Sequence, residues 1–272
     1  DHLSFRDRPW LESTLALTAI GTATSRVGLG FSVLLPALRP YSWAAKQIAT
    51  LQHLFGNRFL LGIGVGGEEP AEWKAAGVPR GDRGERTDAL LTALPQLLSG
   101  QAVTIDGPGG TEIPPLLPAV GVPPVWVGGR SDAALQRTVR FGDVWLGAFV
   151  DPPGVATSIA RLRELSDEAG RDQAPSAAVS VFVHVCSDRA EAERQAADYV
   201  AGIYGLDFSR MRRYVILGDE ETVAEQLVSY IESGARGLTL IGACHRPWTQ
   251  LERFAVVRSL VRSEVDEEPP DR

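Results

Sequence analysis

The chain has 272 residues, of which 44 % are hydrophobic, and its formal net charge is −7. This length suits one large α/β domain such as an α/β barrel, with enough apolar residues for a sizeable core. An acidic chain without a basic run is a poor binder of nucleic acids and membrane surfaces, so we expect a small-molecule substrate. The two cysteines, Cys186 and Cys244, exclude a disulfide framework and favour a reducing, cytoplasmic compartment. They show no metal-ligand spacing, and we expect no metal.

Helices and strands are predicted to alternate along the chain. In order, the predicted elements are a helix over 10–23, a strand over 27–35, a helix over 42–55, a strand over 59–65, a turn over 72–76, a helix over 82–98, a strand over 124–129, a helix over 131–141, a strand over 143–149, a helix over 154–169, a strand over 177–186, helices over 189–203 and 220–233, a strand over 237–241 and a helix over 249–263. Pro95 predicts a kink or break in its helix. Six continuous apolar strands separated by helices predict a parallel sheet covered by helices.

Two segments stand outside this alternation. Residues 101–122 are rich in glycine and proline and too long for an ordinary loop, so they form either a lid or an inserted hairpin. Residues 264–272 form an acidic tail that we predict to be disordered. No linker separates two halves, so residues 1–263 are predicted to be one domain.

The glycines that follow the second strand are the first candidate site. The run Gly62-Ile-Gly64-Val-Gly66-Gly67 has the spacing of a dinucleotide fingerprint, but Glu68 and Glu69 follow it and would repel a pyrophosphate. No long helix begins at these glycines, so we reject that reading. What remains is a backbone that a flat ligand approaches closely beside a carboxylate, or simply a tight strand end with solvated acids.

The second candidate is Gly128-Gly129-Arg130-Ser131. Two glycines end a strand and Ser131 is placed to cap the next helix, so free N–H groups and the positive end of the helix dipole would face a phosphate. Arg130 adds a charge suited to phosphate. The alternative is an ordinary loop with an exposed arginine.

With these motifs, the chain resembles the bacterial luciferase-like monooxygenase superfamily of FMN- or coenzyme F420-dependent oxidoreductases. The matching segments are SRVGLGFSVLLPALRP, AAKQIATLQHLFGNRFLLGIGVGG, EWKAAGVPRGDRGERTDALL and PPVWVGGRSDAALQRTVRFGDVWL. The resemblance implies a TIM (β/α)8-type barrel with an insertion. Because such a barrel has eight strands and six are counted here, we expect its N-terminal strands to be missing from this chain. The resemblance also implies a homodimer.

The family pattern assigns roles to individual residues. His2 would lie near the reactive ring of the cofactor and transfer a proton, assisted by Asp1, and Glu68 would lie near ring and substrate. Ser32-Val33 would support the back of the ring, often through a non-proline cis peptide. The phosphate loop of the family corresponds to Gly128, Gly129, Arg130 and Ser131. Gly66 and Gly67 are added as cofactor-binding positions from the close backbone approach expected at the first candidate site.

The expected function is therefore a flavin- or deazaflavin-dependent oxidoreductase acting on a small organic substrate. FMN would make it a monooxygenase, and coenzyme F420 would make it a hydride-transfer enzyme; the sequence does not separate the two. Two alternatives are a flavin-binding protein without catalysis and an unrelated phosphate-binding barrel enzyme such as a sugar-phosphate isomerase.

Overall fold

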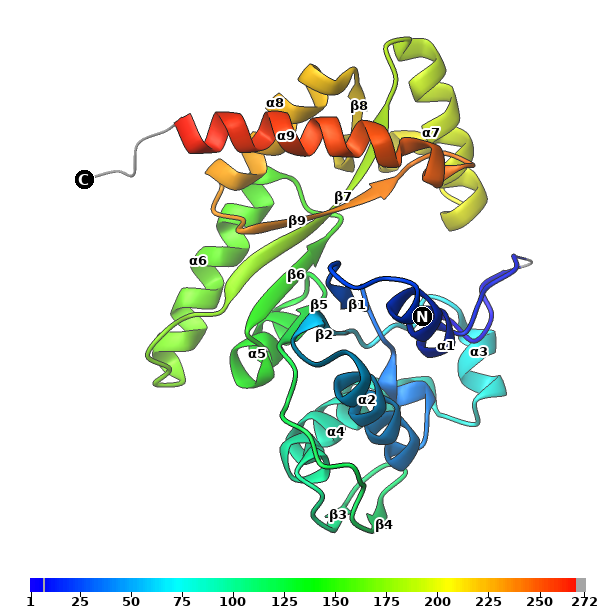
Figure 1. Ribbon diagram of the computed structural model, residues 1–272, viewed down its shortest axis with the longest axis vertical. Coiled ribbons are helices and arrows are strands. Elements are labelled where there is room, and N and C mark those ends of the chain that lie inside the picture. The colour runs from blue at the N-terminus through cyan, green and yellow to red at the C-terminus, as the bar shows by residue number, and fades with distance from the viewer. Residues whose placement is uncertain (7, 268–272) are drawn as a thin grey trace. The chain divides into compact units, whose positions relative to one another are not determined.

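The computed structural model describes residues 1–6 and 8–267 and divides into two compact units. Unit 1 comprises Asp1–Leu146, and unit 2 begins at Gly147. Helices and strands alternate in both units, as the apolar pattern predicts (Figure 1). Within the described residues, no helix is long and apolar enough to cross a membrane.

Unit 1 is built on a parallel sheet with the strand order β1-β2-β5-β6. Its strands are β1 (Leu29–Gly30), β2 (Phe59–Ile63), β5 (Val125–Gly128) and the first three residues of β6 (Val144–Ala148), whose last two residues belong to unit 2. The register pairs Leu61 with Val125 and Val127 with Trp145, and these four side chains are buried. Because neighbouring strands are parallel, their carboxyl ends meet at one edge of the sheet.

The helices of unit 1 are α1 (Ser13–Thr22), α2 (Tyr41–Phe55), α3 (Pro70–Ala75), α4 (Arg83–Leu98) and α5 (Asp132–Phe141), with short 3₁₀ turns η1 (Pro36–Leu38), η2 (Gly56–Arg58) and η3 (Arg80–Asp82). Buried side chains of α1, α2 and α4 share one hydrophobic core. In α2, Ala44, Ala45 and Ile48 are fully buried, which follows the i, i+3, i+4 spacing of an amphipathic helix. The core also takes in strand residues such as Leu61 and Ile63.

Residues 101–122 contain a hairpin, which was one of the two structures predicted for them. Its antiparallel strands are β3 (Val103–Ile105) and β4 (Thr111–Ile113). Ile105 and Ile113 are buried in the core of unit 1, and the hairpin lies beside α4 in Figure 1.

Unit 2 has a parallel sheet in which the long strand β7 lies between β8 and β9. The strands are β7 (Ser176–Val185), β8 (Val215–Gly218) and β9 (Gly237–Gly242). The helices are α6 (Pro152–Glu168), α7 (Arg189–Tyr204), α8 (Glu220–Glu232) and α9 (Leu251–Glu267), with η4 (Phe208–Arg210), η5 (Arg212–Tyr214) and η6 (Pro247–Gln250). Aromatic rings fill part of this unit; Phe149 and Phe182 stack with centroids 5.3 Å apart.

Several boundaries differ from the predictions. The strand predicted over 27–35 is regular only at Leu29–Gly30, and β8 was not predicted. Helix α4 continues through Pro95, because one lost backbone bond is outweighed by buried leucines on both sides of it. Helix α9 extends to Glu267, so residues 264–267 of the predicted tail are helical, while residues 268–272 lie outside the described residues.

Candidate active site

Val33 lies where the carboxyl ends of β2 and β5 meet the chain that follows β1. A Cβ atom on Gly64 would lie 2.4 Å from Val33 Cγ2, and one on Gly128 would lie 2.8 Å from Val33 Cγ1. The two methyl groups therefore occupy space that only glycines at these positions leave open.

Residues 31–35 form an irregular continuation of β1. The peptide bond between Ser32 and Val33 is cis, as the resemblance to the family implied. Leu34 fastens the segment to β2, since its N–H donates to Gly62 O at 2.8 Å and its carbonyl accepts from the Gly64 N–H at 2.9 Å. The segment thus places Val33 at the end of the neighbouring strands.

The carboxylate of Asp1 is braced by four hydrogen bonds. Oδ1 accepts from Ser13 Oγ at 2.6 Å and from Arg39 Nη2 at 2.9 Å. Oδ2 accepts from the Leu35 N–H at 2.8 Å and from Arg39 Nη1 at 2.7 Å. Asp1 thereby ties the start of the described chain to α1 and to the segment that carries Val33.

Glu12 extends this network onto α1. Its Oε1 accepts from Arg39 Nη2 at 2.8 Å, and its Oε2 accepts from the Thr14 hydroxyl at 2.6 Å and the Leu15 N–H at 2.8 Å. Partial burial raises the pKa of Glu12, but these hydrogen bonds outweigh it and the pKa lies below its usual value. Glu12 therefore caps α1 and holds Arg39 toward Asp1.

His2 is paired with Glu72 of α3. Both carboxylate oxygens of Glu72 lie 3.1 Å from His2 Nδ1, and Oε2 also accepts from the Leu3 N–H at 3.1 Å. Glu72 is fully buried. The His2 ring packs against Phe5, with centroids 4.4 Å apart, and meets Trp10 edge-on at 5.6 Å.

The glycines after β2 are held by Leu35 and Arg83. A Cβ atom on Gly66, whose φ is +57°, would lie 2.7 Å from Leu35 Cδ1, and one on Gly67, at φ +117°, would lie 2.8 Å from Arg83 Nε. Arg83 Nε donates to Gly66 O at 3.2 Å. Glu68, which follows Gly67 in the chain, is exposed.

The chain after β5 makes a close turn into α5. Ser131 caps the helix, and its Oγ accepts from the Ala134 N–H at 3.3 Å. Gly129 has a φ of +134°, and a Cβ atom there would lie 2.8 Å from Ala134 Cβ. Trp145 Nε1 donates to Gly129 O at 2.6 Å. The N-terminus of a ten-residue helix is thus presented next to Gly128.

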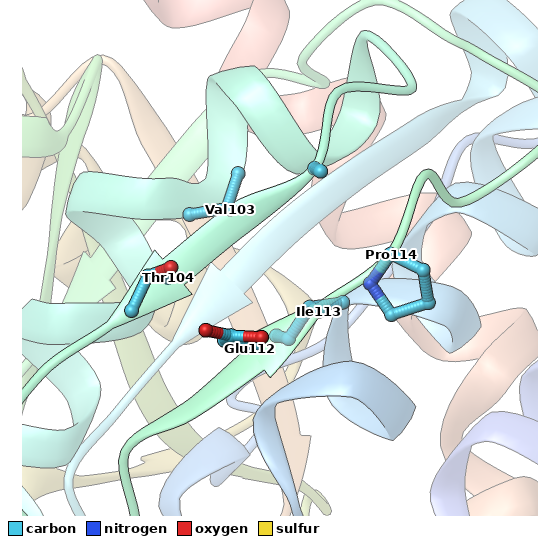
Figure 2. A pocket seen from close by; sticks show the side chains of 6 residues that line it. Val103, Thr104, Glu112, Ile113 and Pro114 are labelled. Carbon is cyan, nitrogen blue, oxygen red and sulfur yellow. The ribbon is translucent and has the colours of Figure 1, made fainter.

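A separate hollow of about 340 Å³ lies on the hairpin. Figure 2 shows Val103 and Thr104 of β3 and Glu112 and Ile113 of β4 lining it, together with Pro114. Ala102 completes the lining. This hollow is distinct from the strand ends that carry the predicted site residues.

The structure brings most of the predicted residues to one edge of unit 1 but also adds partners that were not predicted. Contacts through Leu35 and Val33 connect Asp1 with Gly66, Gly64 and Gly128. Glu72, Arg39 and Arg83 were missed. No local sequence signal marks Glu72, because its partner His2 lies 70 residues away along the chain. Within residues 1–6 and 8–267, no three His, Cys, Asp or Glu side chains are grouped to hold a metal ion.

Comparison with known proteins shows the family of the chain. A model of the luciferase-like monooxygenase family matches residues 1–215. The chain belongs to this family. An uncharacterised protein of Mycobacterium tuberculosis (strain H37Rv) is 35 % identical over 167 residues, which cover 60 % of this chain and 57 % of that protein. The match thus spans little more than half of that protein's length.

Among the solved structures that share the fold of this luciferase-like chain are two enzymes named with different cofactors. An F420-dependent secondary alcohol dehydrogenase in complex with an F420–acetone adduct has a TM-score of 0.83 and 17 % identity, covering 96 % of this chain and 88 % of that one. A type II Baeyer–Villiger monooxygenase of Pseudomonas putida in complex with FMN has a TM-score of 0.73 and 17 % identity, covering 96 % and 85 %. The predicted family and the predicted α/β fold of TIM-barrel type are confirmed.

Proposed function

We propose that this protein is an oxidoreductase that binds FMN or coenzyme F420 at the carboxyl ends of β1, β2 and β5 and acts on a small organic substrate. The observation that carries the proposal is the close packing of the Val33 side chain against Gly64 and Gly128, where a Cβ atom would clash with its methyl groups. His2, the proposed proton carrier, is tied to the same edge through its neighbour Asp1. The match to a family of monooxygenases supports the reaction class.

The residues at this edge fit both ends of such a cofactor. The apolar Val33 side chain would support a flat ring. Because Gly64 and Gly128 have no side chains, their backbone approaches Val33 closely. A phosphate would lie at the N-terminus of α5, where the helix dipole and N–H groups favour an anion. Arg130, which is exposed next to Ser131, would add positive charge.

The cofactor, when bound, supplies the redox chemistry: oxygen activation with FMN, or hydride transfer with the deazaflavin. The protein contributes position, a proton and exclusion of water. His2 would give or take the proton, because its ring is the titratable group held on a buried carboxylate at this edge. The four hydrogen bonds of Asp1 suit it to holding the His2 backbone, and exposed Glu68 would meet the substrate.

The two cofactors remain alternatives within the proposal. A structural neighbour named for F420 and one named for FMN both match the fold at 17 % identity, so neither favours one cofactor here. A homodimer and a cytoplasmic location also remain predictions.

Titration with oxidised and reduced FMN and F420, followed by absorbance and fluorescence, tests the proposal. We expect saturable binding of one of the two and, with the reduced form, oxygen uptake or hydride transfer to an added carbonyl compound. Binding without either reaction would favour a flavin-binding protein, and binding of neither cofactor would contradict the proposal.

A further inference from the structure

We propose that Glu72 is a positioning residue that fixes the His2 ring in one tautomer, with the proton on Nδ1, so that Nε2 is the nitrogen that exchanges a proton in the reaction. The role of His2 in that reaction rests on the proposed function. The assignment of the two ring nitrogens rests on the contacts of Glu72 alone.

The contacts decide which nitrogen carries the proton. An ionised carboxylate has only acceptor atoms, and both oxygens of Glu72 lie 3.1 Å from His2 Nδ1. A lone pair on Nδ1 would face these oxygens and be repelled, whereas an N–H there donates to them. In a neutral ring with the proton on Nδ1, Nε2 carries the lone pair.

Burial makes the hydrogen bond between His2 and Glu72 costly to break. The Glu72 side chain has no exposed surface, while that of His2 is 17 % exposed. A buried carboxylate is costly unless it is hydrogen-bonded, and the bonds found for Glu72 come from His2 and from the backbone N–H of Leu3. Turning the ring over would remove the side-chain donor and leave the buried carboxylate with the Leu3 N–H.

The remaining contacts hold the plane of the ring. Phe5 packs on it at a tilt of 33° and Trp10 meets it at 76°, so the ring is enclosed by aromatic side chains as well as by Glu72. The backbone is gripped on both sides of His2, through the Leu3 N–H on Glu72 and through the carboxylate of Asp1 on Arg39. Nε2 lies on the side of the imidazole ring opposite Cγ, away from Nδ1, which contacts Glu72. An acid that holds a histidine in the tautomer required for proton transfer is a recurrent catalytic device.

The first test measures the tautomer directly and needs no cofactor. Protein labelled with ¹⁵N-histidine is studied by NMR at a pH where the ring is neutral, and the His2 signals are assigned by their loss in His2→Gln. We expect Nδ1 to show the shift of a protonated nitrogen and Nε2 that of an unprotonated one. A wild-type ring protonated mainly on Nε2 would overturn the inference, without bearing on whether the protein binds FMN or F420.

The second test compares variants in the cofactor-loaded protein. Glu72→Gln is expected to lower kcat by about 10- to 100-fold, the usual effect of removing such an orienting partner, with cofactor affinity unchanged. The NMR spectrum of this variant should no longer show His2 in one tautomer. Glu72→Asp should recover part of kcat and part of the preference for the tautomer protonated on Nδ1. Glu69→Gln removes the same charge three residues earlier and is expected to change neither.

The outcomes separate the two claims. Loss of the tautomer in Glu72→Gln with an unchanged kcat would overturn the positioning role. A wild-type protein with the expected tautomer that binds neither cofactor would contradict the proposed function and leave the ring assignment in place. If Glu72→Gln melts at a much lower temperature than wild type, Glu72→Asp and the wild-type spectrum still decide the question.

Discussion

At the scale of single residues, the candidate site depends on side chains that are held from more than one direction. His2 is held by Glu72, Phe5 and Trp10, and Asp1 before it accepts four hydrogen bonds. Proton transfer requires such fixed geometry, because a misplaced donor loses most of its catalytic effect. These contacts give His2 the fixed position that the proposed proton transfer needs.

Replacing His2 tests its part in the reaction. His2→Ala is expected to lower turnover by about 10²- to 10⁴-fold, the range for loss of a general acid or base, and to leave cofactor affinity nearly unchanged. Steady-state kinetics and a cofactor titration measure the two effects. His53→Ala, on an exposed part of α2, is the matched control and should behave as wild type. An unaltered rate in His2→Ala would remove the proton-transfer role.

The sequence indicates some of these residues and not others, for a physical reason. Gly64 and Gly128 are visible because glycines at strand ends mark close backbone approach, and the structure shows Val33 at both. Glu72 and Arg39 are not visible, since their partners lie 70 and 38 residues away and no local pattern records such pairs.

At the scale of elements, a buried arginine clamps the hairpin to the rest of unit 1. Arg86 of α4 donates to three carbonyl oxygens: Ala37 at 3.2 Å, Arg39 at 3.1 Å and Pro108 at 3.0 Å. Its guanidinium lies 4.9 Å from the ring centroid of Tyr41, whose hydroxyl also donates to Pro108 O at 2.8 Å. This clamp supports a fixed hairpin rather than a moving lid, and it also holds the backbone of the arginine that braces Asp1.

Arg86→Met should loosen the hairpin. One buried and two partly buried carbonyl oxygens lose a charged donor, so we expect the free energy of unfolding to fall by about 2–5 kcal/mol. Hydrogen exchange should become faster at the amides of β3 and β4, as measured by mass spectrometry. Arg161→Met, which removes the exposed ion pairs of Arg161 with Glu164 and Glu168 on α6, should change stability by less than about 1 kcal/mol. Unchanged exchange in the hairpin would contradict the clamp.

The predicted elements differ from the structure mainly where tertiary contacts override local pattern. Pro95 is tolerated because α4 is buried along most of its length. Strand β8 was overlooked because it has only three apolar residues, Val215, Ile216 and Leu217, and follows two arginines. The predicted strand over 27–35 ends early because Leu34 and its neighbours leave the regular ladder to place Val33.

At the scale of the whole molecule, the alternation of helices and strands carries most of the information about fold. It predicts a parallel α/β structure, and the family match and the solved structures confirm that class. All the predicted site residues lie in unit 1, whose sheet brings the ends of β1, β2 and β5 to one edge. The central claim is that this edge binds the cofactor.

The measurement that tests this claim most directly is the cofactor affinity of Gly128→Asp. A side chain there would strike Val33 Cγ1, 2.8 Å from the new Cβ atom, and its charge would repel a phosphate at α5. We expect binding of FMN or F420 to weaken at least about tenfold, the equivalent of 1.4 kcal/mol. Gly121→Asp adds the same side chain where no atom lies within 4 Å, and it should bind as wild type does. Equal affinities of the two variants would contradict the placement of the cofactor at this edge.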